Sequence, residues 1–255
     1  MKKNDLDNEI TTMIADMSSL KSVQKFSKKY LEMYEEQSLD LLFLNAGYGG
    51  RIAGDKLELS EDGIEPVFVT NYLGHHLMYR LLEPMLLRSK MARIVQTSSV
   101  VSFLTFEHKV GTSLKQLNSP DYDPSSLKYY GQSKLAQILW TKHLTRRLGD
   151  SSSVFVNAFH PGAVDTGIFN DWERGLPSGV FSFFKRANSY FLWSAAEASL
   201  TMLYLGAAKE SLVNNNIRGK YFHPQAQEII NPLSLDEKLQ KELWEFSDDL
   251  ISNFL

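Results

Sequence analysis

The 255-residue chain contains no cysteine, which excludes disulfide bonds, thiolate metal sites and cysteine nucleophiles and is compatible with a reducing compartment. Neither sign of charge dominates, and a net charge of −3 provides no electrostatic footprint for nucleic acid. His75, His76 and His160 show no metal-ligand spacing, so no metal site is expected. No apolar run reaches the roughly 20 residues that span a bilayer, and residues 1–7 lack the apolar core of a signal peptide. These absences predict a cytoplasmic protein without a membrane span.

Apolar runs rich in β-branched residues alternate with segments of helical periodicity, and this pattern predicts one α/β domain with a parallel sheet between two layers of helices. Strands are expected at Ile10–Ala15, Leu39–Leu44, Arg93–Ser99, Val154–Phe159 and Lys220–Phe222. Helices are expected after Ser18 or Ser19, at Pro66–Arg88 with Pro84 bending or ending it, around Tyr130 as far as Leu148, at Ala195–Ala208 and at Leu235–Phe254. The polar stretch from about Phe103 to Ser126 is expected to be a surface loop.

Polar residues follow four of the predicted strands. They are Asp16, Asn45, Ser99 and the triplet His160–Gly162. The carboxyl ends of parallel strands lie at one edge of a sheet, where ligands bind in the crevice beyond them. The sequence therefore predicts a site that gathers these side chains at one edge.

Tyr130 and Lys134 lie four residues apart in a predicted helix, so they project from the same face. A positive charge within about 4–6 Å favours the phenolate and lowers the pKa of a tyrosine from about 10. Such a pair can pass a proton to or from an alcohol or carbonyl oxygen. The alternative interpretation is an aromatic side chain beside a lysine that extends along it by chance.

Six short motifs occur in a telling order. They are Asp16–Leu20, Asn45–Gly47, Thr70–His75, Arg93–Ser99, Tyr130–Lys134 and His160–Thr166. In this order they resemble the short-chain dehydrogenase/reductase family, particularly its retinol-dehydrogenase-like branch, and Gly219–Phe222 and Leu243–Ser247 resemble that branch as well. The resemblance covers nearly the whole chain.

The resemblance implies a Rossmann-like doubly wound sheet and an NAD(P)-dependent oxidoreductase that interconverts an alcohol and a carbonyl on a hydrophobic small molecule. By it, Tyr130 is the general acid/base, and Lys134 lowers the pKa of Tyr130 and holds the nicotinamide ribose. Ser99, the second serine of its pair, donates a hydrogen bond to the substrate oxygen, and Asn71 holds a water molecule. Stabilising charge on that oxygen is the main catalytic requirement of hydride transfer.

The resemblance also implies which residues bind the cofactor. Asp16 meets the adenine, and the remaining residues line the adenosine side or bracket the nicotinamide: Asn45, Ala46, Gly47, Pro161, Gly162, Val164 and Thr166. NADP is favoured over NAD only because that branch is largely NADP-dependent. Without the resemblance, Asp16 is equally well a helix cap, the alternative for Asn45 and Gly47 is a role as turn residues, and the alternative for Pro161 and Gly162 is a plain turn.

Two further expectations come from the family. The aromatic segment 169–194 occupies the place of a substrate lid, with a helix packed on the core as the alternative. Family members often form homo-oligomers through the helices that include the one bearing Tyr130, so a homo-oligomer is a candidate state.

One family feature is missing from the 255 residues, namely the glycine-rich turn Thr-Gly-x-x-x-Gly-x-Gly that cradles the pyrophosphate. Asn45–Gly50 cannot replace it, because it follows a different strand. The expected fold is therefore N-terminally truncated, without the first two strands. Either Ile10–Ala15 closes against Leu39–Leu44, or buried backbone groups stay unpaired at about 1–3 kcal/mol each. The second functional hypothesis is a truncated or degenerate family member that binds or interacts without catalysis.

Overall fold

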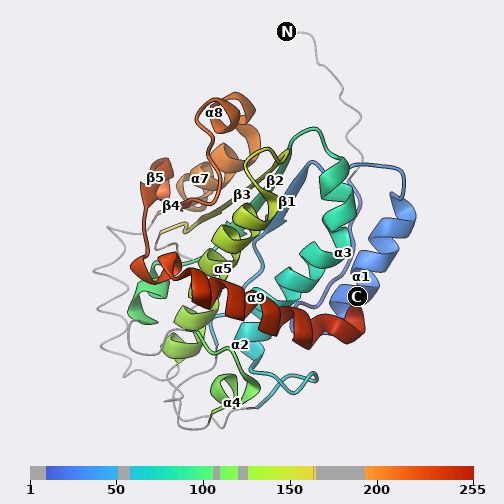
Figure 1. The fold of residues 1–255 in the computed structure, drawn as a ribbon, viewed down its shortest axis with the longest axis vertical. Helices are drawn as coiled ribbons and strands as arrows, with labels where there is room; N and C mark the ends of the chain where they lie inside the picture. Colours follow the sequence, from blue (N-terminus) through green and yellow to red (C-terminus); the bar gives the residue numbers. More distant parts are fainter. Residues whose placement is uncertain (1–9, 51–57, 106–109, 120–125, 163, 165–192) are drawn as a thin grey trace.

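The computed structural model describes residues 10–50, 58–105, 110–119, 126–162, 164 and 193–255, and these build one five-stranded sheet (Figure 1). The strands follow one another in the order β1 (Leu41–Leu44), β2 (Ala92–Thr97), β3 (Val154–Phe159), β4 (Tyr221–His223) and β5 (Gln227–Ile229). The first four are parallel and β5 is antiparallel to β4. The predicted α/β class and parallel sheet are confirmed, and β5 is an element that the sequence pattern did not indicate.

Side chains of the central strands alternate between two apolar clusters, because successive residues of a strand point to opposite faces. On β2, Ile94 belongs to the larger cluster, whereas Val95 belongs to a second one with Phe155 and Leu205. The larger cluster is covered by α1 (Leu20–Met33), α3 (Gly74–Arg88), α5 (Ser126–Leu148) and α9 (Glu237–Ile251). The second is covered by α7 (Ala195–Ala207) and α8 (Lys209–Asn214). Both faces of the sheet are therefore buried, as in doubly wound folds.

Most predicted helices form close to their expected bounds. Ser19 is the N-cap of α1 and accepts a hydrogen bond from the Ser22 N–H. Gly149 follows α5 with a φ of 77°, a left-handed conformation that glycine adopts readily. The segment predicted as one helix from Pro66 is instead three pieces, α2 (Pro66–Phe68), a π-helical turn η1 (Val69–Leu73) and α3, which continues through Pro84.

The strand predicted at Ile10–Ala15 is wrong. Residues 10–16 have no regular structure, and Ile10 and Ile14 are 89% and 91% exposed. A strand requires a hydrogen-bonded neighbour, and β1 pairs with β2 alone among the described strands. The other edge of β1 is open enough to leave Phe43 37% exposed. Ile10–Ala15 thus does not close against β1.

The stretch from Phe103 to Ser126 is more structured than the predicted surface loop. It begins within a 3₁₀ helix, η2 (Val100–Thr105), and includes α4 (Leu114–Leu117). Val110 and Leu117 are buried in the larger apolar cluster. Burial of these two apolar side chains stabilises the position of a segment whose composition is otherwise polar. Three more 3₁₀ helices complete the described structure, η5 (Pro224–Ala226), η6 (Pro232–Leu235) and η7 (Ser252–Phe254).

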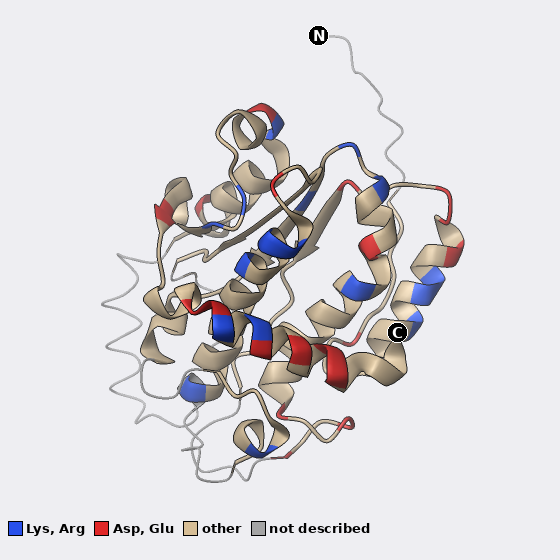
Figure 2. Ribbon diagram, viewed as in Figure 1, with Lys and Arg blue, Asp and Glu red and all other residues tan. Residues whose placement is uncertain are grey.

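Charged side chains of both signs are spread over the helices, and α9 carries both along its length (Figure 2). Within the described part of the chain, no helix is long and apolar enough to cross a membrane.

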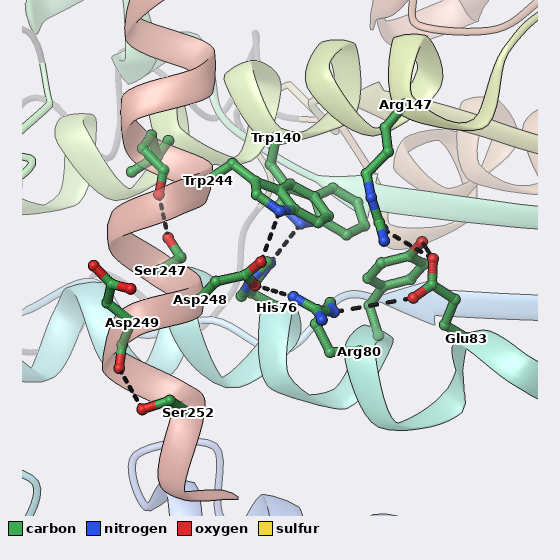
Figure 3. Close-up of polar contacts among 12 residues, drawn as sticks. His76, Arg80, Glu83, Trp140, Arg147, Trp244, Ser247, Asp248, Asp249 and Ser252 are labelled. Atoms are coloured by element: carbon green, nitrogen blue, oxygen red, sulfur yellow. Dashed lines mark hydrogen bonds and ion pairs between the residues drawn. The ribbon is translucent and has the colours of Figure 1, made fainter. Parts of the chain in front are cut away.

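Helix α9 lies across α5 and α3 and is fixed there by Asp248 (Figures 1 and 3). The Asp248 carboxylate accepts hydrogen bonds from Nε2 of His76 at 2.8 Å, from Nε1 of Trp244 at 2.9 Å and from Nη1 of Arg80. Nδ1 of His76 accepts the Trp140 N–H at 2.9 Å, so the imidazole is neutral and carries its proton on Nε2. Burial lowers the pKa of His76, which favours this neutral form. The carboxylate therefore joins α9 to α3, and His76 extends the connection to α5 through Trp140.

Removing this carboxylate should destabilise the fold. In Asp248→Ala, the buried His76 N–H and the Trp244 N–H lose their acceptor, and we expect the free energy of unfolding to fall by about 2–4 kcal/mol. Urea denaturation followed by tryptophan fluorescence measures the change. Asp249→Ala is the matched control, because Asp249 is exposed on the same helix, and it should change stability by less than about 0.5 kcal/mol. Equal losses in the two variants would contradict the role of Asp248.

Candidate active site

A pocket of about 310 Å³ opens at the carboxyl ends of β1, β2 and β3. Its walls include eight residues that the sequence singled out: Asn45, Gly47, Ser99, Tyr130, Lys134, Pro161, Gly162 and Val164. They come from the loops after β1, β2 and β3 and from α5. The parallel arrangement of these strands brings the loops together, as expected for this class of sheet.

The two serines after β2 have different partners. The hydroxyl of Ser98 is buried and donates to the backbone carbonyl of Lys134 at 2.7 Å. Ser99 is hydrogen-bonded to the Tyr130 side chain, and its hydroxyl also accepts the Val101 N–H at 3.3 Å. Ser98 therefore attaches the strand end to α5, whereas Ser99 is the serine that meets the phenol.

Tyr130 is buried, with 4% of its surface exposed. Burial raises the pKa of Tyr130, and the hydrogen bond with Ser99 acts in the opposite direction. The lowered pKa expected from Lys134 is wrong for the protein alone. The Lys134 Nζ lies over the ring, 5.4 Å from its centroid, and burial has the larger effect on the phenol. Tyr130 is therefore a protonated hydroxyl in the free protein, ready to act as an acid.

Lys134 is 2% exposed, and burial lowers its pKa from 10.5 to about 7. Its Nζ donates to the backbone carbonyl of Thr97 at 3.0 Å. Thr97 provides the one acceptor for this ammonium in the described part of the chain, so two of its three protons remain for a ligand. A Cβ on Gly47 would lie 3.5 Å from the Nζ, which places the loop after β1 directly against the lysine.

Asn71 lies in the π-helical turn η1 and is fully buried behind the pocket. Its side chain accepts the Tyr48 N–H at 2.7 Å and donates to the Tyr48 carbonyl at 3.0 Å and to the Ser133 hydroxyl at 2.9 Å. Its backbone carbonyl accepts from Gln137 at 2.6 Å. A π turn alters the register of a helix at a single position and is common at functional sites. Asn71 therefore joins the loop after β1 to α5.

Asp16 lies apart from this pocket. It lines a separate pocket with five other residues, Ser18, Ser19, Ser60, Glu61 and Pro66. Its carboxylate accepts from the backbone and hydroxyl of Ser18, and these bonds lower its pKa. The expected gathering of Asp16 with the other strand ends is wrong, because residues 10–15, which precede it, form no strand. The contacts place Asp16 in a polar turn that leads into α1, and the N-cap of that helix is Ser19, so the alternative of Asp16 as the helix cap is wrong as well.

The other predicted residues divide into two groups. Ala46 is exposed and is absent from the pocket walls. Thr166 and nearly all of segment 169–194 lie outside the described residues.

The sequence did not single out the wall that α7 provides. Ala195, Ala198, Ser199 and Met202 face the pocket, together with Thr97 and Phe159. No motif marks the α7 residues, and only the packing of α7 on β2 and β3 brings them to the strand ends.

The pocket fits the nicotinamide-ribose end of a dinucleotide. Lys134 offers two N–H donors, and the hydroxyls of Ser99 and Tyr130 stand beside it. The residues found here do not include a glycine-rich turn for the pyrophosphate, and that motif occurs nowhere in the sequence. The geometry thus accounts for one half of such a cofactor.

Comparison with known proteins agrees with this class of fold and site. A family model described as short chain dehydrogenase matches residues 1–111. Retinol dehydrogenase 14 from Homo sapiens is 34% identical over 245 residues, which cover 95% of this chain and 67% of that protein. Short-chain dehydrogenase TIC 32 A, chloroplastic, from Brassica napus is 32% identical over 245 residues, with 93% and 71% covered.

Solved structures share the fold. A protein from Mycobacterium paratuberculosis superposes with a TM-score of 0.61 at 25% identity, over 93% of this chain and 74% of that one. The NADPH-bound carbonyl reductase from chicken fatty liver gives a TM-score of 0.52 at 18% identity, over 84% and 75%. The α/β sheet and the serine, tyrosine and lysine at its carboxyl edge define a Rossmann-like oxidoreductase class. The chain belongs to the short-chain dehydrogenase/reductase family, and its relatives make it retinol-dehydrogenase-like.

The buried Lys134 should lower the free energy of unfolding of the protein when no ligand is bound. Its depressed pKa means that the folded state disfavours the charged form, so stability rises with pH between about 7 and the ordinary value of 10.5. We expect Lys134→Met to raise the free energy of unfolding at pH 7 by about 1–4 kcal/mol, and the gain to shrink by pH 10.

Thermal and urea unfolding at the two pH values measure this gain. Lys128→Met on the same helix is the control, because Lys128 is less buried, and we expect no comparable gain from it. A Lys134→Met variant less stable than wild type at pH 7 would show that the lysine supports the fold.

Proposed function

We propose that the chain is an NAD(P)-dependent oxidoreductase that interconverts an alcohol and a carbonyl on a hydrophobic small molecule. The observation that carries this proposal is the meeting of Ser99, Tyr130 and Lys134 in one pocket. A hydroxyl donor, a proton carrier and a buried cation are the groups that carbonyl reduction requires.

In the direction of reduction, the substrate carbonyl oxygen lies between the hydroxyls of Ser99 and Tyr130. The nicotinamide, when bound, supplies the hydride. Tyr130 gives its proton to the oxygen as negative charge develops there, and Ser99 donates a second hydrogen bond to the same oxygen. The raised pKa of the free Tyr130 suits the acid role in this direction.

Lys134 has two tasks in this scheme. Its free N–H groups hold the ribose hydroxyls, and this hydrogen bonding stabilises the ammonium form that burial disfavours. The positive charge then makes the tyrosinate that remains after proton transfer less costly. Asn71 holds the water molecule through which Lys134 reaches solvent. This water donates to the second lone pair of the Asn71 backbone carbonyl, because the Gln137 side chain donates to the first.

The kind of substrate is inferred from the walls. Much of the pocket surface is apolar, because it is formed by Phe159, Val164, Ala198 and Met202, and this supports a hydrophobic alcohol or carbonyl as substrate.

The cofactor is held by the remaining predicted residues. The nicotinamide is bracketed by Pro161, Gly162 and Val164, the adenosine side is lined by Asn45 and Gly47, and Asp16 meets the adenine from its separate pocket. The NADPH-bound reductase among the structural relatives supports NADP as the cofactor.

A non-catalytic binding protein is the second candidate, because the 255 residues contain no Thr-Gly-x-x-x-Gly-x-Gly turn. A homo-oligomer and a cytoplasmic location stay predictions. Pairing through α5 would have to use the part of that helix that α9 leaves free.

Fluorescence titration with NADPH and NADH separates the oxidoreductase from the non-catalytic binding protein. Micromolar binding contradicts the non-catalytic candidate, whereas the absence of binding at millimolar cofactor contradicts the enzyme.

Tyr130→Phe should lower kcat/KM by about 10²–10⁴-fold, because it removes only the hydroxyl that carries the proton. The NADPH dissociation constant and the unfolding midpoint should stay close to those of wild type. Steady-state reduction of a hydrophobic aldehyde measures the rate.

Tyr129→Phe is the matched control. Tyr129 is a neighbouring buried tyrosine whose hydroxyl donates to the Ser119 carbonyl at 3.2 Å, so its loss should leave the rate within a factor of about three. A Tyr130→Phe variant that retains more than about a tenth of the rate would show that another group carries the proton.

A further inference from the structure

Two histidines meet beside the pocket without lining it. His160 follows β3 and is 4% exposed, and His223 is the last residue of β4. Nε2 of His160 and Nδ1 of His223 are hydrogen-bonded, and the rings stand edge to face with centroids 4.5 Å apart. The backbone N–H of His160 also donates to the Phe222 carbonyl at 3.0 Å, so the two residues are held at adjacent strand ends.

The contacts determine where the protons lie. Nδ1 of His160 accepts the backbone N–H of Gly162 at 3.1 Å, so this nitrogen carries a lone pair. A neutral imidazole then has its proton on Nε2, which donates to Nδ1 of His223. Nδ1 of His223 must therefore be unprotonated as well. A proton added at either of these two Nδ1 atoms removes one of the two hydrogen bonds.

Gly162 is held tightly by this arrangement. Its φ is 84°, and a Cβ there would lie 2.6 Å from Cδ1 of Trp193 and 3.1 Å from Cγ of Pro224. The glycine and its neighbours Pro161 and Val164 form one wall of the pocket. The His160 ring thus fixes the amide at the centre of that wall.

The wall that α7 provides is attached to the same pair. Thr201 of α7 donates to the His223 carbonyl at 3.3 Å, and its hydroxyl accepts the Ala226 N–H at 3.0 Å. Ala198 and Met202, three residues before and one after Thr201, face the pocket. A chain of hydrogen bonds therefore runs from Gly162 through His160, His223 and Thr201 to α7.

We propose that His160 and His223 form a positioning pair that sets the distance between the Gly162 wall and the α7 wall of the pocket. The pair works only when both Nδ1 atoms are unprotonated. The consequence for nicotinamide binding rests on the proposed function, whereas the pair itself does not. Among the residues that the structure describes, the titratable groups that face His160 are His223 and Tyr221, both of β4, and the Tyr221 ring centroid lies 5.8 Å from that of His160. Burial and then the neighbouring His223 lower the pKa of His160 to about 4, which keeps it neutral at pH 7.

Nuclear magnetic resonance of ¹⁵N-labelled protein at pH 7, without cofactor, tests the pair directly. Long-range ¹H–¹⁵N spectra should show His160 protonated on Nε2 alone. In His223→Leu, the His160 N–H loses its acceptor, and we expect the Gly162 amide to exchange with solvent about tenfold faster. His223→Asn keeps an oxygen near the position of Nδ1 and should restore the slow exchange of wild type.

Two results would overturn the pair: a His160 ring protonated on Nδ1 in the wild-type protein, or unchanged Gly162 exchange in a folded His223→Leu. The wild-type spectrum decides the matter even where His223→Leu does not fold. A titration with NADPH then gives the functional consequence, for which we expect the dissociation constant to rise about tenfold in His223→Leu but not in His223→Asn. If the wild-type protein does not bind NADPH, the proposed function is contradicted, and the spectra still test whether His160 and His223 form the positioning pair.

Discussion

The attachment of α5 to the end of β2 is the constraint on which the site depends. Lys134 makes it in both directions, since its Nζ donates to the Thr97 carbonyl and its own carbonyl accepts from Ser98. These two bonds fix the height of the helix over the strand, and the position of Tyr130 one turn earlier follows from helical geometry. Ser99 then meets the phenol because it is the next residue after Ser98.

The fold accepts an unfavourable group to obtain this geometry. A buried ammonium with one acceptor is a cost to the free protein, as the depressed pKa of Lys134 shows. Ligand sites commonly reduce the stability of the free protein in this way, because a charged group there has no partner until the ligand binds. The surroundings compensate with a rigid frame, in which Asn71 joins the loop after β1 to α5 and the histidine pair joins the two walls.

The rest of the molecule supports this frame from a distance. Strands β2 and β3 are buried on both faces, and alternate side chains give each face its own apolar cluster. Helix α9 closes the outer side of α3 and α5, because the Asp248 carboxylate is bonded to His76 and Arg80 of α3 and His76 is bonded in turn to Trp140 of α5. The open edge of β1, with its exposed Phe43, is one of the two edges of the described sheet, and β5 forms the other.

The sequence by itself determined the parallel sheet and most helices, because periodicity is a local property that the chain carries in one dimension. The set of Ser99, Tyr130 and Lys134 was expected from the order of the family motifs, and only the pairing of Tyr130 with Lys134 also follows from helical spacing. The sequence pattern misjudged Ile10–Ala15, since a strand exists only where a neighbour pairs with it. It also misjudged the pKa of Tyr130, because burial depends on everything that covers the ring. Only the tertiary structure decided that Asp16 lies apart, that α7 forms a wall and that His160 meets His223, for these contacts join residues far apart in the chain.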